Sequence, residues 1–208
     1  MQHDIYNLAL KTSIGQGDSD RHLLTLFSIV LGGEYKNNLE LGVRNGDTTI
    51  PLFRSTFING GLLTSVDLNE CLIAKDKIEK IEQSYGAEPN QHWKFYQSDA
   101  IKFLENYQGS PFDLVYIDDW HSYSHVKKEL ELLDRLVTPK SVILIHDLMY
   151  GNTAPYYHSD LTLKDGQWAE GGPYRAVAEL NPQFWEFSTL PYNNGLTILR
   201  KKYSSLYR

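Results

Sequence analysis

"LELGVRNGDTTIPLF", residues 39–53, contains the change of pattern that decides the fold. It begins as an apolar strand and continues as a helix, with Glu40, Gly42 and Gly46 around the join. Glycine lets a backbone turn tightly and lets another group approach without a Cβ in the way. The free N–H groups at the start of the following helix, near Thr48, suit an anion. The stretch predicts a turn that holds a nucleoside cofactor or, alternatively, a tight strand-to-helix turn without a ligand.

Strands and helices alternate along the rest of the chain. Nearly unbroken apolar runs predict strands at 37–42, 62–68, 93–99, 112–119, 141–147, 184–190 and 196–201. Helical spacing of apolar residues predicts helices at 18–31, 48–57, 71–86, 100–107, 122–136 and 174–180. Asp18 or Ser19 is expected to cap the first helix. The pattern predicts an α/β fold with a doubly wound, mostly parallel seven-stranded sheet, and the turn "PYNNG" predicts a C-terminal antiparallel hairpin.

The composition limits the classes of function. The 208 residues, 41% hydrophobic, suffice for one domain spanning 1–208. A net charge of -6 without a long basic run argues against nucleic acid or an anionic membrane as partner. No apolar run approaches the ~20 residues that cross a bilayer, and we expect no signal peptide. The single cysteine, Cys71, favours a reducing, cytoplasmic setting. Assembly into a homo-oligomer is left open.

The residues that end the strands are the candidate site, because ligands of doubly wound sheets bind outside the carboxyl ends of the strands. Asp67 ends the second strand, where an acid binds the ribose hydroxyls in nucleotide-binding folds; its alternative role is a helix N-cap. Asp99 ends the third strand and is expected to cap the next helix, to face an adenine amino group, or to do both.

Two acids, Asp118 and Asp147, follow the fourth and fifth strands. If these strands are neighbours, their ends lie about 4.8 Å apart. Carboxylates so close repel each other unless a cation or a proton lies between them, and Mg²⁺ suits such a site. Alternatively, Asp118 binds an ammonium group of the cofactor and Asp147 caps a loop.

Three histidines lie near these acids. His121 is the first candidate for a general base, because a histidine of ordinary pKa, ~6.5, accepts a hydroxyl proton at neutral pH. Its alternative roles are to cap the following helix or to pack on Tyr123. His146 is a second candidate, alternatively a buried hydrogen-bonded residue. His125 is expected on the surface.

Two segments, 1–20 and 148–172, are candidates to cover a substrate. The second is too long for a plain connection and is rich in tyrosine. Its alternative roles are a surface loop or an oligomer contact.

The motifs "LELGVRNG", "SVDLN", "YQSDA", "FDLVYIDD" and "VILIHD", in this order, resemble those of the class I methyltransferases that use S-adenosylmethionine. The resemblance covers about residues 38–147 and implies a Rossmann-like fold. It implies that the glycine turn surrounds the methionine part of the cofactor, that the second-strand acid holds the ribose, and that the third strand end lines the adenine pocket. The implied cofactor-binding residues are Glu40, Gly42, Gly46, Thr48, Asp67, Asp99, Ala100, Asp118 and Trp120.

The last two motifs also resemble the metal-dependent small-molecule O-methyltransferases, both the catechol type and a group acting on sugar hydroxyls. The catechol type has the run aspartate, any residue, tryptophan, lysine, where this chain has Asp118, Trp120 and His121. Trp120 is thereby implied to pack against the adenine. The catechol type has an asparagine ligand where this chain has Leu148. The third metal ligand is therefore open between His146 and Asp119, and His146 would favour Mn²⁺ or a zinc-like ion.

These features predict transfer of a methyl group from S-adenosylmethionine to a hydroxyl oxygen of a small molecule, a sugar or a phenol, assisted by Mg²⁺ or Mn²⁺ at Asp118 and Asp147. One alternative is a metal-independent methyltransferase that acts on another acceptor. Another is a module that binds S-adenosylmethionine without catalysis. A nicotinamide dehydrogenase is disfavoured, because the middle glycine of G-x-G-x-x-G is missing.

Overall fold

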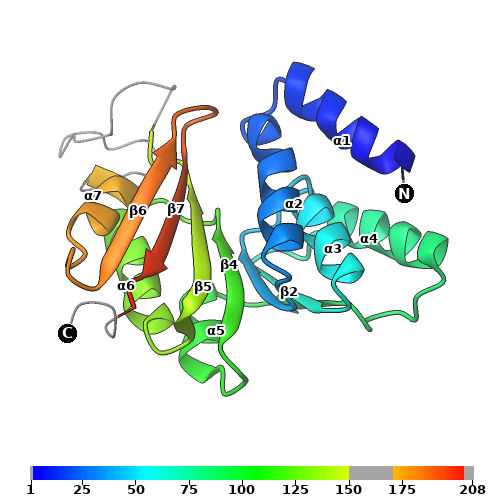
Figure 1. Cartoon of the computed structure of the whole chain (residues 1–208). Helices are drawn as coiled ribbons and strands as arrows, with labels where there is room; N and C mark the ends of the chain where they lie inside the picture. Colours follow the sequence, from blue (N-terminus) through cyan, green and yellow to red (C-terminus); the bar gives the residue numbers. More distant parts are fainter. Residues whose placement is uncertain (1, 150–170, 204–208) are drawn as a thin grey trace.

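A seven-stranded sheet forms the centre of the computed structural model, which describes residues 2–149 and 171–203 (Figure 1). The strand order is β3-β2-β1-β4-β5-β7-β6. The first five strands pair in parallel, whereas β7 is antiparallel to both β5 and β6. The strands are β1 (Asn37–Leu41), β2 (Leu62–Asp67), β3 (Trp93–Gln97), β4 (Phe112–Ile117), β5 (Val137–His146), β6 (Trp185–Leu190) and β7 (Leu196–Lys201). The predicted fold class and the C-terminal hairpin are confirmed.

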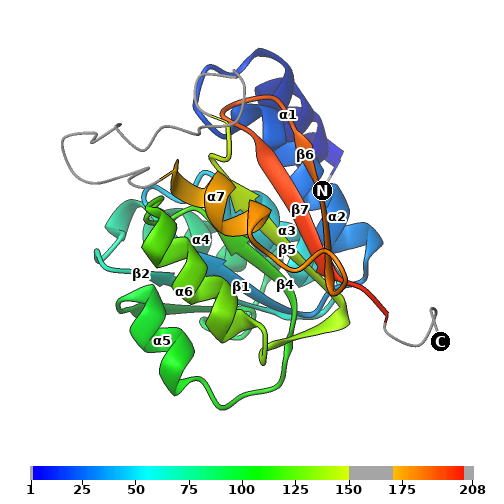
Figure 2. The same ribbon diagram turned by 90° about the vertical axis from the view of Figure 1, so that its left-hand side faces the viewer.

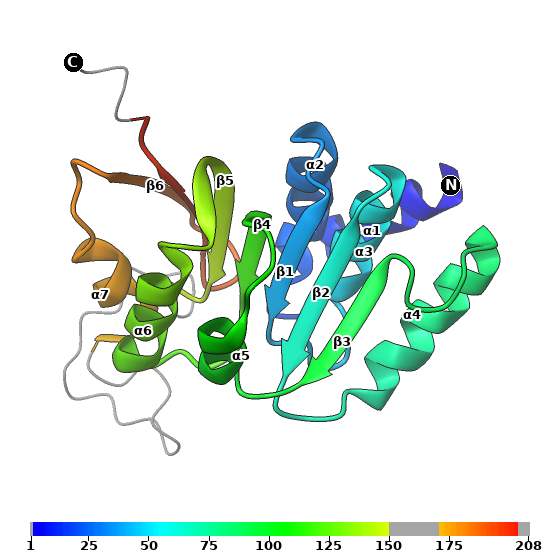
Figure 3. The same cartoon turned by 90° about the horizontal axis from the view of Figure 1, so that it is seen from below.

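Helices cover both faces of the sheet (Figures 2 and 3). One face carries α2, α3 and α4, and α1 packs on the outside of α2. The other face carries α5, α6 and α7. The helices are α1 (Gln2–Ile14), α2 (Leu23–Gly32), α3 (Thr49–Ile58), α4 (Leu72–Tyr85), α5 (Ala100–Asn106), α6 (Tyr123–Leu133) and α7 (Gly172–Ala178). Within the described part of the chain, no helix is long and apolar enough to span a membrane.

The parallel strands are apolar because a helix layer covers each side of them. Leu39 and Leu41 of β1 pack in the core beneath α5 and α6. Asn38 and Glu40 alternate with them, and both are fully buried beside α3. Two hydroxyl groups of α3 bond to these side chains: Thr49, at the start of the helix, donates to Glu40, and Thr56, near its end, accepts from Asn38. The two buried polar residues in this strand therefore dock α3 on the sheet.

The structure corrects three sequence predictions at element ends. The first helix does not begin at Asp18 or Ser19: a short 3₁₀ turn, η1 (Asp20–His22), comes first, and neither predicted side chain caps it. Asp18 instead binds Arg44. β5 begins at Val137, four residues before the predicted 141, and pairs with Phe112 across a register shift. α1 was not predicted.

The two candidate covering segments differ in what the structure describes. Residues 2–14 form α1, whose Leu8 packs against Leu23 and Phe27. Most of the segment 148–172 lies outside the described residues, so its predicted covering role stays a prediction.

Candidate functional site

The glycine turn after β1 brings two strand ends into contact. Gly42 has φ +89°, and a Cβ there would lie 2.3 Å from the carbonyl oxygen of Asp118, which follows β4. Gly46 has φ +80°, and its Cβ would lie 2.8 Å from that of Ala74. Both positions combine a backbone conformation that favours glycine with a close neighbour. The predicted tight turn is confirmed, and it lies between the ends of β1 and β4, where the strand order reverses.

Glu40 lies beneath this turn rather than on its surface. Its carboxylate is fully buried and accepts hydrogen bonds from Thr48 (3.1 Å), Thr49 (3.0 Å) and Ser65 (2.7 Å). The indole N–H of Trp93 donates to Ser65 in turn, at 2.9 Å. Burial raises the pKa of Glu40 to about 7, although the three hydroxyl donors oppose the rise. Glu40 therefore ties the start of α3 to β2 from inside the protein.

Because of this buried carboxyl group, stability should depend on pH. The folded protein holds the Glu40 proton up to about pH 7, whereas the ordinary pKa is 4.5. The free energy of unfolding should therefore fall as the pH rises from about 5 to about 7, by on the order of 3 kcal/mol from this group. Denaturant unfolding of the wild type and Glu40→Gln, measured across this range, checks it. Parallel curves for the two proteins would assign the pH dependence to other groups.

A cavity of about 310 Å³ opens at the carboxyl ends of β1, β2, β3 and β4. Its lining includes six of the nine residues predicted to bind the cofactor: Gly42, Asp67, Asp99, Ala100, Asp118 and Trp120. Trp120 is 37% exposed, so much of its ring is free to pack on a ligand. The structure thus brings together residues from four separate segments that the strand-end rule selected.

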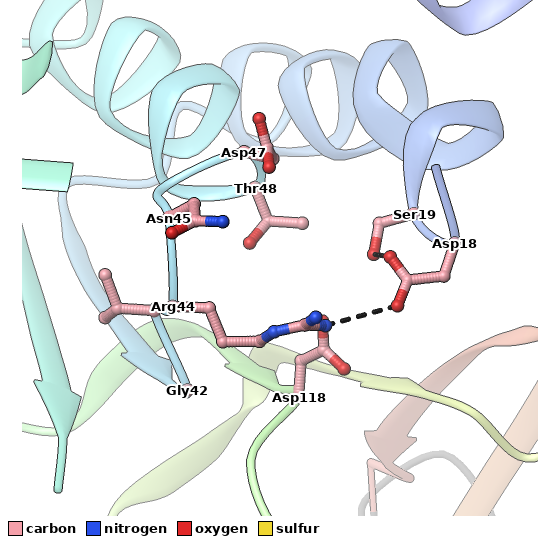
Figure 4. A pocket seen from close by; sticks show the side chains of 9 residues that line it. Asp18, Ser19, Gly42, Arg44, Asn45, Asp47, Thr48 and Asp118 are labelled. Atoms are coloured by element: carbon pink, nitrogen blue, oxygen red, sulfur yellow. Dashed lines mark hydrogen bonds and ion pairs between the residues drawn. The ribbon is translucent and has the colours of Figure 1, made fainter. Parts of the chain in front are cut away.

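A smaller cavity of about 60 Å³ adjoins the first and shares Gly42, Arg44 and Asp118 with it (Figure 4). Thr48, also predicted to bind the cofactor, lines it. Arg44 reaches across the cavity and donates to Asp18 at 3.2 Å. The segment before α2 therefore closes one side of the small cavity. Of the predicted cofactor residues, only Glu40 and Gly46 line neither cavity among the described residues.

Asp67 joins the glycine turn to the larger cavity. One of its carboxylate oxygens accepts from the backbone N–H groups of Val43 (2.8 Å) and Arg44 (3.1 Å). The other accepts from the N–H of Asn69 at 2.8 Å. These donors lower the pKa of the half-buried Asp67, against the opposing effect of burial. Asp99 has the predicted capping role, because it accepts from the N–H of Lys102 at 2.9 Å.

Two acids and two histidines gather where β4 and β5 end side by side. His121 Nε2 lies 3.4 Å from Asp118 Oδ1 and 3.3 Å from Asp147 Oδ2. His146 Nδ1 lies 3.3 Å from Asp118 Oδ1 and 3.0 Å from Asp147 Oδ1. Asp147 has φ +64°, in the left-handed region that a residue other than glycine rarely adopts. The predicted convergence of both acids and both histidines is present in the structure.

The charges of this cluster shift its pKa values in opposite directions. Burial lowers the pKa of His121, but Asp118 and Asp147 outweigh it and raise the pKa above its ordinary value. Burial also acts to lower the pKa of His146, but the same two acids outweigh it and raise the pKa well above its ordinary value. Burial acts to raise the pKa of Asp118, yet the two histidines hold it far below its usual range. Without a cation, the cluster therefore favours protonated histidines over neutral ones.

The donor set fits a divalent cation. Asp118, His121 and Asp147 each offer one ligand atom, and these atoms lie within 4.8 Å of one another. His146 Nδ1 faces the same two carboxylates. Asp119, the other candidate for a third ligand, faces His125 instead, at 3.0 Å. Ser122 caps α6, so the alternative capping role of His121 is not observed.

Sequence reasoning missed several residues around this cluster. His22 lies edge-on to His146, with ring centroids 5.5 Å apart, and its Nε2 lies 2.6 Å from the carbonyl oxygen of Tyr192. Tyr116 donates to Asp118 at 3.0 Å. His125 was expected at the surface, but its side chain is only 14% exposed. That prediction is wrong because the start of α6 folds over Asp119.

Two protein families match parts of this sequence. The family described as "Methyltransferase domain" matches residues 39–148, more than half of the chain. The chain belongs to this family and is a class I S-adenosylmethionine-dependent methyltransferase. The family described as "Rhamnosyl O-methyltransferase/CmcI" matches residues 98–199. No curated protein matches the sequence.

Solved structures share the fold at low sequence identity. The SAH-bound methyltransferase PaMTH1 from Podospora anserina has a TM-score of 0.67 at 17% identity, over 96% of this chain and 88% of that one. An O-methyltransferase from Bacillus cereus in complex with SAH has a TM-score of 0.66 at 18% identity, over 95% and 90%. TomG is an O-methyltransferase from Streptomyces achromogenes that is involved in tomaymycin synthesis and was solved in complex with SAM. It has a TM-score of 0.67 at 16% identity, over 89% of this chain and 81% of that one.

Proposed function

We propose that this chain transfers a methyl group from S-adenosylmethionine to a hydroxyl oxygen of a sugar or a phenol, with the help of Mg²⁺ or Mn²⁺. The observation that carries the proposal is the convergence of Asp118, His121 and Asp147 beside the larger cavity. The match to the family described as "Rhamnosyl O-methyltransferase/CmcI", over the half of the chain that holds this cluster, supports oxygen as the acceptor and a sugar among the substrates.

In this proposal the larger cavity holds the adenosine. Asp67 accepts a hydrogen bond from the ribose diol in place of the one from the side-chain amide of Asn69, at 3.2 Å, and Trp120 packs on the adenine. The smaller cavity, beside Thr48 and Asp118, takes the amino-acid end. Asp118 lines both cavities and also faces His121, so it places the methyl donor next to the acceptor.

The chemistry needs alignment and a base. Bound S-adenosylmethionine would supply a sulfonium methyl group: the acceptor oxygen bonds to the methyl carbon as the carbon–sulfur bond breaks, and S-adenosylhomocysteine leaves. A cation held by Asp118 and Asp147 supplies Lewis acidity, which lowers the pKa of a hydroxyl group. With those carboxylates neutralised, the effect that raises the pKa of His121 is removed. If His146 Nδ1, which faces the same two carboxylates, is the third ligand of the cation, His121 Nε2 would accept the proton of the acceptor hydroxyl near neutral pH, while the two cavities hold the reactants in line.

A methyl-transfer assay tests this function. The purified chain is incubated with S-adenosylmethionine labelled in its methyl group, with Mn²⁺ or Mg²⁺, and with a panel of sugars and phenols. Label on a hydroxyl oxygen of the acceptor is the expected result. Calorimetric binding of the donor without product from any acceptor would instead indicate a binding module without catalysis. Label on nitrogen or carbon would contradict the assigned acceptor class.

Asp67→Ala should weaken binding of S-adenosylmethionine by about 10- to 100-fold, because hydrogen bonds to a charged group contribute about 1.5–3 kcal/mol. Isothermal titration calorimetry measures this. Asp113→Ala is the matched control, since Asp113 likewise accepts from two backbone N–H groups, of Lys36 and Asn37, each at 2.9 Å. Asp113 is at the start of β4, the opposite end from the site. Equal losses in both variants would show that Asp67 acts only through folding.

A further inference from the structure

A second cluster of potential metal ligands lies beside the larger cavity and shares no residue with the Asp118 cluster. Asp119 follows β4, whereas His125 and Glu129 lie one turn apart on α6. His125 Nε2 is 3.0 Å from Asp119 Oδ2 and 3.5 Å from Glu129 Oε1. One ligand atom from each of the three lies within 4.8 Å of the other two.

Glu129 is the member that the protein leaves unsatisfied. Its side chain is fully buried, and neither carboxylate oxygen accepts a hydrogen bond from the described residues. A carboxylate buried without donors costs several kcal/mol unless a proton or a cation compensates it. His125 Nε2 carries at most one proton, and Asp119 is its nearer acceptor. The histidine alone therefore does not balance both acids.

The pKa values of Glu129 and His125 are shifted in the direction that an excess of negative charge among Asp119, His125 and Glu129 would cause. Burial and the charge of Asp119 raise the pKa of Glu129 well above its ordinary value, although His125 opposes this. Burial acts to lower the pKa of His125, but Asp119 and Glu129 outweigh it and raise the pKa to about 10. Both shifts mean that the site attracts positive charge.

We propose that Asp119, His125 and Glu129 bind a divalent transition-metal ion of the zinc type. One imidazole nitrogen with two carboxylate oxygens is a donor set that zinc accepts, whereas Mg²⁺ prefers oxygen alone. Bonds of about 2.0–2.2 Å in a tetrahedral site place ligand atoms about 3.3–3.6 Å apart. The separations of 3.0 and 3.5 Å are close to this range.

The location of the cluster gives the ion access from solvent. Asp119 and His125 both line the larger cavity, while Glu129 lies behind them. The cavity side thus leaves room for a water molecule as the remaining ligand. An ion here would fix Asp119, and with it the neighbouring Trp120, to α6. The site itself needs no cofactor and does not rest on the proposed methyl transfer.

The test uses the chelator-treated full-length chain without cofactor, titrated with Zn²⁺ in a calorimeter. Because the Asp118 cluster also offers ligands, Asp147→Asn serves as the background that weakens that cluster. We expect Asp147→Asn to retain one Zn²⁺, and Asp147→Asn with His125→Gln to bind it at least tenfold more weakly. Co²⁺ in the same variants should give intense visible absorption only where His125 is present.

Glu129→Gln separates metal binding from folding. The amide removes a buried acid, so the variant should keep its circular dichroism and melting temperature while losing at least tenfold in Zn²⁺ affinity. Zinc binding should also release protons, seen as a dependence of the heat on the buffer, because both His125 and Glu129 must be deprotonated. Absence of Zn²⁺ binding in Asp147→Asn, or binding that Glu129→Gln leaves unchanged in that Asp147→Asn background, would overturn the proposal. Protons on the side chains of the cluster would then be what compensates its charge.

Discussion

Replacing His121 with alanine should lower kcat by about 10²- to 10⁴-fold, the usual contribution of a positioned general base. The affinity for S-adenosylmethionine should hardly change, because His121 lines neither of the two cavities among the described residues. The imidazole instead faces Asp118 and Asp147, at 3.4 and 3.3 Å. Its loss therefore removes the proton acceptor and leaves the donor site in place.

Steady-state kinetics together with calorimetry check this result. His92→Gln is a suitable control: His92 directly precedes β3, at the end of the sheet remote from the site, and its Nδ1 lies 2.7 Å from the carbonyl oxygen of Gly61. It should keep wild-type kcat. If His121→Ala lost activity and cofactor affinity to the same extent, His121 would belong to the cofactor site and not to proton transfer.

Removing divalent cations should be comparably damaging. Lewis-acid assistance contributes several kcal/mol, and each 1.36 kcal/mol is tenfold in rate, so chelation should lower kcat by about 10²-fold or more. Mn²⁺ or Mg²⁺ added afterwards should restore it. Asp147→Asn should reproduce the loss without a chelator, because it removes one of the two carboxylates that face His121 and His146.

Asp76→Asn controls for the loss of a surface charge, since Asp76 is exposed on α4, where it pairs with Lys80 at 2.7 Å. It should leave activity unchanged. Activity that withstands both the chelator and Asp147→Asn would favour a metal-independent methyltransferase, in which Asp118 serves the cofactor alone.

The strand-end rule explains why so much of the site was predictable. In a parallel sheet the carboxyl ends of the strands share one edge, so Asp67, Asp118 and Asp147 had to lie along the same edge once the strands were placed, with Asp118 and Asp147 on neighbouring strands. The burial of Glu40 beneath α3 could also have been predicted from the sequence. It alternates with Leu39 and Leu41, and therefore points to the opposite face, towards α3.

Contacts between distant segments could not be read in this way. His22 reaches His146 only because the turn before α2 packs against the hairpin, where Asn193 accepts from the N–H of Arg21 at 2.7 Å. α1 escaped prediction because few of its side chains are buried: Leu8 packs inward, whereas Tyr6 is 67% exposed. A helix with so narrow an apolar contact leaves little periodic signal.

The burial of Glu129 was missed for a related reason. Glutamate on a helix is normally exposed, but Glu129 lies on the core-facing side of α6 with Val126, Leu130 and Leu133. His125 was assigned to the surface by the same reasoning.

The most direct measurement is a crystal structure of the chain with S-adenosylhomocysteine and Mn²⁺, with the ion located by its anomalous scattering. The account predicts adenosine in the larger cavity, between Asp67 and Trp120, and manganese between Asp118 and Asp147 beside His121. Adenosine bound away from Asp67, or manganese absent from the two carboxylates at saturating concentration, would contradict it.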